Sequence, residues 1–166
     1  MTQMPIAALI YDLETDPGPV LVETARALEA RGVTLAGAIE LSTGSCAMEL
    51  ELLPSARRIP ISQNLGSGAS GCRLDTTALA EAASMVRQAI AGKPSLVIFN
   101  KFGAQEAEGG GLHGEIAAAV SAGVPVLIPV PERFLAQWSE FTGAEFTALS
   151  CDTDAALAWW DSVSRD

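Results

Sequence analysis

Short apolar runs alternate with amphipathic helical segments along this chain, and this alternation constrains its fold more than any other feature. Residues 6–10, 95–99 and 125–130 are apolar runs, as strands buried on both faces of a sheet are. Between such runs, apolar residues recur every three or four positions, as on the inner face of a helix. The pattern is typical of a mainly parallel sheet covered on both faces. The sequence therefore predicts a three-layer α/β fold.

The remaining segments fit the same architecture. Residues 33–41 and 47–53 read as two strands joined by a turn, which predicts an antiparallel hairpin inserted into the sheet. Asp75 or Thr76 is expected to cap a helix over residues 75–91. Further short strands are expected at residues 58–61 and 145–149, and further helices at 20–31, 112–122, 131–142 and 153–163. Neither a linker nor a repeat is evident, so we expect a single α/β domain over residues 1–166.

Composition narrows the class of protein and its partners. The 166 residues carry a formal charge of −10 with only 10 basic residues, and these are scattered, which argues against nucleic-acid binding. The charge-free run over residues 116–131 is broken by Gly123, Pro125 and Pro129, so it does not read as a membrane span. The three cysteines lie far apart, and the first residues do not resemble a signal peptide. We expect a reduced, cytoplasmic protein that does not insert into membranes.

Three loops should meet where ligands bind in such sheets, beyond the carboxyl ends of the strands. The first, residues 11–19, stands where a phosphate-binding loop would lie between a strand and a helix. It lacks the lysine and all but one glycine of that motif, and it carries Asp12, Glu14 and Asp16, which would repel phosphate. This degenerate Walker A segment predicts a residual loop or a carboxylate-lined metal site in place of a triphosphate site.

The second loop, residues 62–72, is rich in glycine and serine. Its glycines free the backbone to curl around an anion, its serines add hydroxyl donors, and Arg73 adds charge beside a helix start. Cys72, next to that arginine, is a candidate for a lowered thiol pKa, although an idle thiol is the more common case. The alternative for the whole loop is a mobile surface segment. The candidate anion-binding residues here are Gly66, Ser67, Gly68, Ser70, Gly71, Cys72 and Arg73.

The third loop, residues 100–111, follows the most apolar strand. Asn100 and Lys101 begin it and are both candidate anion-binding residues. Lys101 would neutralise a bound anion; the alternative is a solvated lysine. The guanine-reading motif N-K-x-D fails here because Gly103 stands in the aspartate position. Glu106 is the candidate metal ligand, or else an ordinary surface acid. His113, the only histidine, lies at a helix start where it can donate to an anion, although a lone histidine is more often structural.

At these loops the sequence resembles a bacterial family, the domain of unknown function 2478. The resemblance covers nearly the whole chain, and its most specific part is the run N-K-F-G-x-x-E-x-E-G that begins at Asn100. It also rests on the segments 61–66, 71–75, 125–127 and 138–143. The resemblance implies a fold similar to P-loop nucleoside triphosphatases and an association with molybdate transport and molybdenum enzymes. It supplies no catalytic residue.

Three functions are therefore considered. The first is a non-hydrolytic binding protein for a small oxyanion, with molybdate or tungstate as the leading ligand. The second is a nucleotide-dependent phosphohydrolase using Lys101 and Glu106 with Mg²⁺, which the missing phosphate-loop lysine disfavours. The third is a scaffold whose loops bind another protein, which an exposed apolar patch would favour. The expected partner is a small anion, and assembly into a homo-oligomer is left open.

Overall fold

The computed structural model describes residues 5–42, 48–53, 57–64, 72–110 and 112–164. Helices and strands alternate along them, as the apolar pattern predicts. In chain order the elements are β1 (Ile6–Tyr11), α1 (Gly18–Ala30), β2 (Leu35–Ser42), β3 (Met48–Leu53), β4 (Arg58–Pro60), β5 (Ser62–Asn64), β6 (Cys72–Leu74), α2 (Thr76–Ala91), β7 (Leu96–Ile98), α3 (Ala104–Ala107), α4 (His113–Ser121), β8 (Val126–Pro131), the 3₁₀ turn η1 (Glu132–Phe134), α5 (Leu135–Thr142), β9 (Thr147–Ser150) and α6 (Thr153–Val163).

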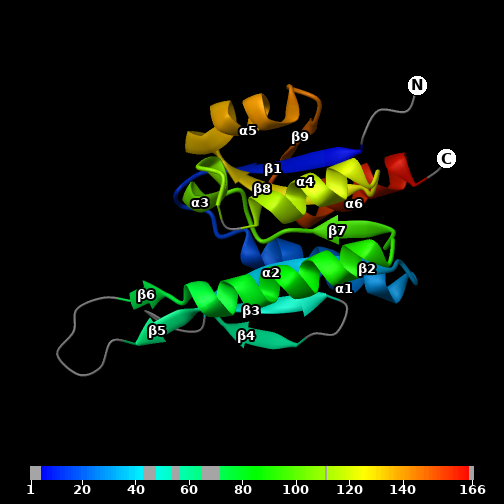
Figure 1. Ribbon diagram of the computed structural model, residues 1–166. Helices are drawn as coiled ribbons and strands as arrows, with labels where there is room; N and C mark the ends of the chain where they lie inside the picture. Colours follow the sequence, from blue (N-terminus) through cyan, green and yellow to red (C-terminus); the bar gives the residue numbers. More distant parts are fainter. Residues whose placement is uncertain (1–4, 43–47, 54–56, 65–71, 111, 165–166) are drawn as a thin grey trace.

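Within the described residues, the main sheet has the strand order β4-β3-β2-β7-β8-β1-β9. The strands β2, β7, β8, β1 and β9 run parallel to their neighbours, and β3 and β4 are antiparallel additions at one side. The parallel core of β1, β7 and β8 and the hairpin of β2 and β3 are both confirmed predictions. Helices cover the two faces of this sheet, so the chain folds into three layers (Figure 1).

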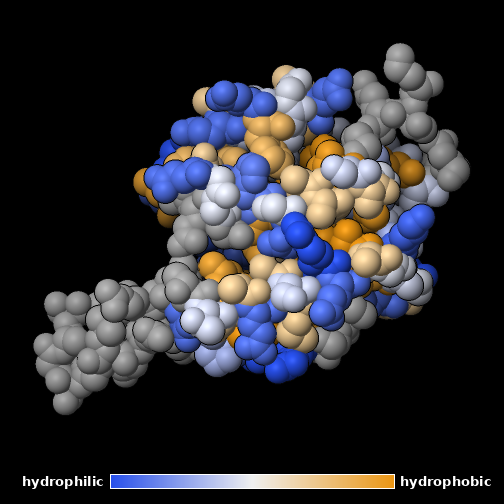
Figure 2. Space-filling model, in the orientation of Figure 1, coloured by the Kyte–Doolittle hydropathy of each residue, from blue (hydrophilic) through white to orange (hydrophobic). Residues whose placement is uncertain are grey.

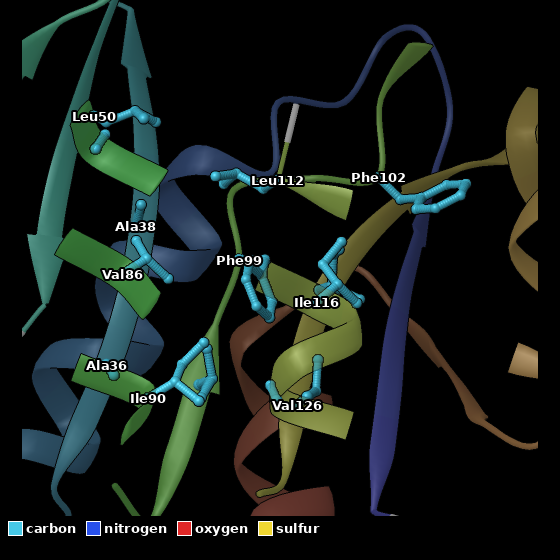
Figure 3. Close-up of a cluster of buried hydrophobic side chains, with 14 of the residues drawn as sticks. Ala36, Ala38, Leu50, Val86, Ile90, Phe99, Phe102, Leu112, Ile116 and Val126 are labelled. Carbon is cyan, nitrogen blue, oxygen red and sulfur yellow. The ribbon is translucent and has the colours of Figure 1, made fainter. Parts of the chain in front are cut away.

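Alternating side chains of the strands build a core on each face. Ala8 of β1 belongs to the core that includes residues of α2, α4 and α5, whereas Leu9 belongs to the core that includes residues of α1 and α6. Figure 3 shows the first of these cores, in which Val86 and Ile90 of α2 and Ile116 of α4 meet the sheet. Burying both faces requires the strands to be apolar throughout, and this requirement explains the uninterrupted apolar runs in the sequence.

A glycine in β2 leaves no room for a side chain against the neighbouring strand β7. Gly37 of β2 has a φ of +124°, and a Cβ atom on it would lie 1.8 Å from the carbonyl oxygen of Ile98 in β7. No side chain fits there, so β2 and β7 depend on a glycine for their pairing.

The segment after β4 departs from the sequence prediction. The flanks of the expected glycine- and serine-rich loop form a separate antiparallel hairpin, in which β5 pairs with β6 and Gln63 lies opposite Arg73. Arg73 therefore belongs to a strand, and α2 begins after it at Thr76. The helix is capped as predicted, because the Asp75 carboxylate accepts the Ala78 N–H at 3.0 Å. Strands this short carry no apolar periodicity that the sequence could display.

Candidate functional site

The topology places a crevice at the carboxyl ends of β1 and β8. These two strands are parallel neighbours, yet α1, which follows β1, packs on one face of the sheet, and α5, which follows β8, packs on the other. Loops that diverge in this way leave a gap between them, and ligands of α/β sheets bind at such switch points. The β1–α1 loop, the end of β2 and the residues after β7 all reach this edge.

A pocket of about 240 Å³ lies at this edge. It combines hydroxyl, carboxylate, amide and ammonium groups. Its lining residues are Tyr11, Thr15, Asp16, Pro17, Gly18, Glu40, Asn100 and Lys101. Two other hollows in the described residues lie near Pro5 and Ile6, at the opposite ends of the strands, and a further one lies between Gly37 and Met85; their walls are mainly apolar. The polar pocket at the carboxyl edge is therefore the candidate site.

Carboxylate side chains of the β1–α1 loop accept hydrogen bonds from backbone N–H groups of the same loop. Asp16 accepts the Gly18 N–H at 3.0 Å, and Gly18 is the first residue of α1. Pro17 and Pro19 carry no N–H at all. A phosphate-binding loop works by pointing several free N–H groups of a helix start at an anion. Here an internal carboxylate already takes that position, so the loop is not built to hold a triphosphate.

Asp12 fixes the first half of the same loop. Its Oδ1 accepts both the Glu14 N–H at 3.0 Å and the Thr15 hydroxyl at 2.9 Å. These hydrogen bonds lower the pKa of the Asp12 carboxyl, that from the Thr15 side chain most strongly. The carboxylates that appear in the sequence as repulsive to phosphate therefore also shape the loop.

Asn100 and Lys101 face this loop from the end of β7. The Lys101 ammonium donates to Oε2 of Glu40, from β2, at 3.1 Å. Asn100 is 8% exposed, and its Oδ1 has no hydrogen-bond partner among the described residues. The structure thus brings two of the candidate anion-binding residues to one pocket. Glu40 does not stand out in the sequence, although a charged residue at the end of an otherwise apolar strand is a signal for such a position.

Tyr11 closes the pocket where β1 ends. Burial raises the pKa of its phenol to about 12, because the phenolate would lose water and would face the carboxylates of Glu40 and Asp16; Arg133 acts in the opposite sense. Burial also raises the pKa of Cys151, with Asp152 and Asp16 adding to the effect. Tyr11 therefore offers a neutral hydroxyl to a ligand at ordinary pH.

Glu106 holds the third loop together. This buried side chain accepts the Gly103 N–H at 3.0 Å with Oε1 and the Leu112 N–H at 2.9 Å with Oε2. A metal ion would compete with both hydrogen bonds, and the metal role of Glu106 stays a prediction. Among the residues whose positions are described, no group of three or more histidine, cysteine or acidic side chains is arranged to hold a metal.

His113 lies at the start of α4, outside the residues that line the pocket. Its ring packs edge-on against Phe141 of α5, with ring centroids 4.5 Å apart. Its anion-binding role stays a prediction, and the observed contact is the structural one expected of a lone histidine.

The second loop is only partly described. Gly66, Ser67, Gly68, Ser70 and Gly71 lie outside the described residues. The backbone of Cys72 and Arg73 is placed in β6, but their side chains are not described. The hairpin of β5 and β6 and the helix α3 lie toward the same end of the molecule, at the left of Figure 1. The roles expected of these residues remain predictions.

A solved structure of another protein has a fold similar to that of this chain. Over 96% of this chain and 99% of the other, the structure is similar to the crystal structure of THEP1 from the hyperthermophile Aquifex aeolicus, with a TM-score of 0.68 and 10% identity. This likeness shows that the two chains share one fold, the three-layer α/β architecture described above. No described helix is both long and apolar enough to cross a bilayer.

Similarity in sequence gives more specific information about the family of this chain. The chain is 40% identical over 166 residues to a "Molybdenum import ATP-binding protein ModC 2" of Bradyrhizobium diazoefficiens, an alignment that covers 96% of this chain and 18% of that protein. The family described as "Protein of unknown function (DUF2478)" matches residues 6–159. Because this match spans nearly the whole chain, the protein belongs to the DUF2478 family.

Proposed function

We propose that this protein is a non-hydrolytic binding module for a small oxyanion, with molybdate or tungstate as the leading ligand. The observation that carries the proposal is the pocket at the carboxyl edge, where Lys101 and the buried Asn100 meet a turn whose Gly18 N–H is already bound by the Asp16 carboxylate. The name of the relative in molybdenum import supports the choice of oxyanion.

The size of the pocket favours a small ligand. Pockets for drug-sized molecules span roughly 300–1,000 Å³, whereas this one measures about 240 Å³. A tetrahedral oxyanion needs little room and a few convergent donors. A nucleoside triphosphate needs a long groove and a loop of free backbone amides.

The charges in the pocket also oppose nucleotide hydrolysis. Phosphoryl transfer requires Mg²⁺, which the P-loop triphosphatases hold with a hydroxyl and an aspartate. The residues after β7 are instead an amide, Asn100, and a cation, Lys101, whose ammonium bonds to Glu40. An ammonium beside the carboxylate repels a divalent cation, and it can pair with an anion directly.

The proposal adds donors from the glycine- and serine-rich segment and from Arg73. Amide N–H groups and hydroxyls bind an oxyanion without net positive charge, which suits a chain of charge −10. The hairpin that carries this segment lies toward the end of the molecule that the pocket-lining loop also occupies (Figure 1). A scaffold role finds less support, because Leu13 is the one large hydrophobic residue that is exposed in the described parts of the chain. On the face that Figure 2 shows, polar and apolar residues are interspersed.

Calorimetry with molybdate, tungstate, sulfate and phosphate tests the proposal. Each hydrogen bond from a charged donor contributes about 1.5–3 kcal/mol, so Lys101→Ala should weaken binding by about ten- to a hundredfold. Arg73→Ala should have a similar effect. Lys93→Ala is the matched control, because Lys93 lies in the exposed turn after α2. If none of the four anions binds, or if both variants bind like the native protein, the proposal is wrong.

A further inference from the structure

The ammonium of Lys101 already has a partner within the protein. Its partner, the Glu40 carboxylate, lies 3.1 Å away and comes from the neighbouring parallel strand. The Lys101 and Glu40 side chains are 36% and 23% exposed, so the pair lines the open pocket and is not sealed in the core. An anion entering the pocket therefore meets a lysine whose charge is cancelled.

The same pocket contains an unused polar group. Asn100 is more than nine-tenths buried, and its Oδ1 has no hydrogen-bond partner among the described residues. A buried carbonyl oxygen without a partner loses free energy. The same amide group also carries two N–H donors. The pocket wall thus holds an amide beside a lysine whose ion-pair partner is the Glu40 carboxylate.

From this arrangement we propose that Glu40 is a built-in competitor of the ligand and sets its affinity. This inference rests on the proposed oxyanion function. The Glu40 carboxylate occupies the position beside Lys101 that an oxyanion oxygen would take. The anion binds when Glu40 gives up the ammonium. Glu40 therefore keeps binding weak and reversible, and the release of the ligand restores the internal ion pair.

Competition has a different signature from general repulsion. Every carboxylate near the pocket repels an anion through space, and this repulsion is screened by salt. Only Glu40 forms an ion pair with Lys101 among the described residues, so only its removal frees the ammonium. The gain from removing Glu40 should therefore depend on Lys101, which a double-mutant cycle measures.

The test is calorimetric titration of the native protein and its variants with sodium tungstate and sodium molybdate. Glu40→Gln should tighten binding about tenfold. Glu14→Gln is the matched control: it removes the same charge from an exposed side chain of the β1–α1 loop, which also borders the pocket, and it should change affinity by less than about twofold. In a Lys101→Ala background, Glu40→Gln should lose most of its effect. Thermal unfolding checks that each variant is folded. If Glu40→Gln is not folded, Glu40→Asp, which shortens the side chain that carries the carboxylate, replaces it in the test.

Each outcome separates the competitor role from the proposed function. Tighter binding by Glu40→Gln alone, or binding that becomes detectable only in Glu40→Gln, supports the competitor role. If the native protein binds either anion and Glu40→Gln binds no better than Glu14→Gln, the competitor role is wrong while the oxyanion function stands. An equal gain in the native and Lys101→Ala backgrounds also overturns it. If neither the native protein nor Glu40→Gln binds, both proposals fall.

Discussion

Carboxylate side chains satisfy backbone donors in the loops at the carboxyl edge of the sheet. Asp12 and Asp16 do so in the β1–α1 loop, and Glu106 does so between β7 and α4. In each case a charged oxygen binds an N–H that no helix or strand partner reaches. These residues shape the pocket through the backbone.

Glu106 offers a direct test at the residue scale. Glu106→Gln keeps the size of the side chain, but one of its two acceptors becomes an N–H donor that faces another backbone N–H. We expect a loss of about 1–3 kcal/mol in the free energy of unfolding, measured by urea denaturation. Glu108→Gln, at an exposed position nearby, should cost less than about 0.5 kcal/mol. Equal losses in the two variants would contradict a role of Glu106 in stabilising the loop through its two hydrogen bonds. Stabilisation of the native protein by Mg²⁺ would favour the metal role.

Tyr11 permits a second residue-scale prediction because it is the only tyrosine of the chain. Its phenolate absorbance should appear near pH 12 in the folded protein, whereas an ordinary tyrosine ionises near pH 10. The folded state holds this proton more tightly than the unfolded state, so stability is full below about pH 10 and falls as the pH rises toward 12. Urea denaturation over this range should show the loss, and Tyr11→Phe should reduce it. Ionisation of Tyr11 near pH 10 would show that the phenol is solvated.

Local sequence patterns predict the roles of some residues and not of others. The Asp75 cap follows from a local rule, because an aspartate before an apolar helical pattern is a strong helix start. The Lys101–Glu40 pair joins residues 61 positions apart, and no local pattern encodes it. The sequence does predict that Asn100 and Lys101 follow a strand, and topology alone then brings them to the carboxyl edge. Their partner depends on which strands are neighbours.

At the scale of elements, segments with an apolar run or a repeating apolar pattern were predictable. The strands β1, β7 and β8 lie in apolar runs, and α2 repeats apolar residues over several turns. By contrast, β5, β6 and α3 have three or four residues each and contain no apolar run. The sequence therefore predicts a single loop where the structure has a hairpin.

The pairing of β2 with β7 gives the element-scale prediction. Gly37→Ala places a methyl group 1.8 Å from the Ile98 carbonyl oxygen in a backbone conformation that alanine rarely adopts. The strands would have to separate, so we expect a loss of about 2–4 kcal/mol in the free energy of unfolding. Gly92→Ala is the control, since its Cβ would approach no closer than 3.4 Å to the Ala89 carbonyl oxygen and its φ is −77°. A loss at Gly37 no larger than that at Gly92 would show that the two strands can shift at little cost.

At the scale of the whole molecule, the fold and the chemistry of the site depend on different residues. The structural likeness to THEP1 covers 96% of the chain at 10% identity, so the architecture persists while the residues differ. Layers, strand order and core depend on apolar patterning, which many sequences satisfy. The reaction depends on a few polar residues at the carboxyl edge. A P-loop-like fold therefore does not by itself predict hydrolysis.

The last prediction follows from that separation: the protein should not hydrolyse ATP or GTP at an enzyme-like rate. The Asp16 carboxylate occupies the start of α1, Pro17 and Pro19 lack N–H groups, and the Lys101 ammonium repels Mg²⁺ near Glu40. Phosphate release with excess Mg²⁺ should stay far below the common range of about 1 per second. Asp16→Asn is informative, because it removes the internal anion and retains an acceptor; it should not create activity, since the motif lysine is still missing. Turnover near 1 per second by the native protein would show that the loop rearranges to bind phosphate.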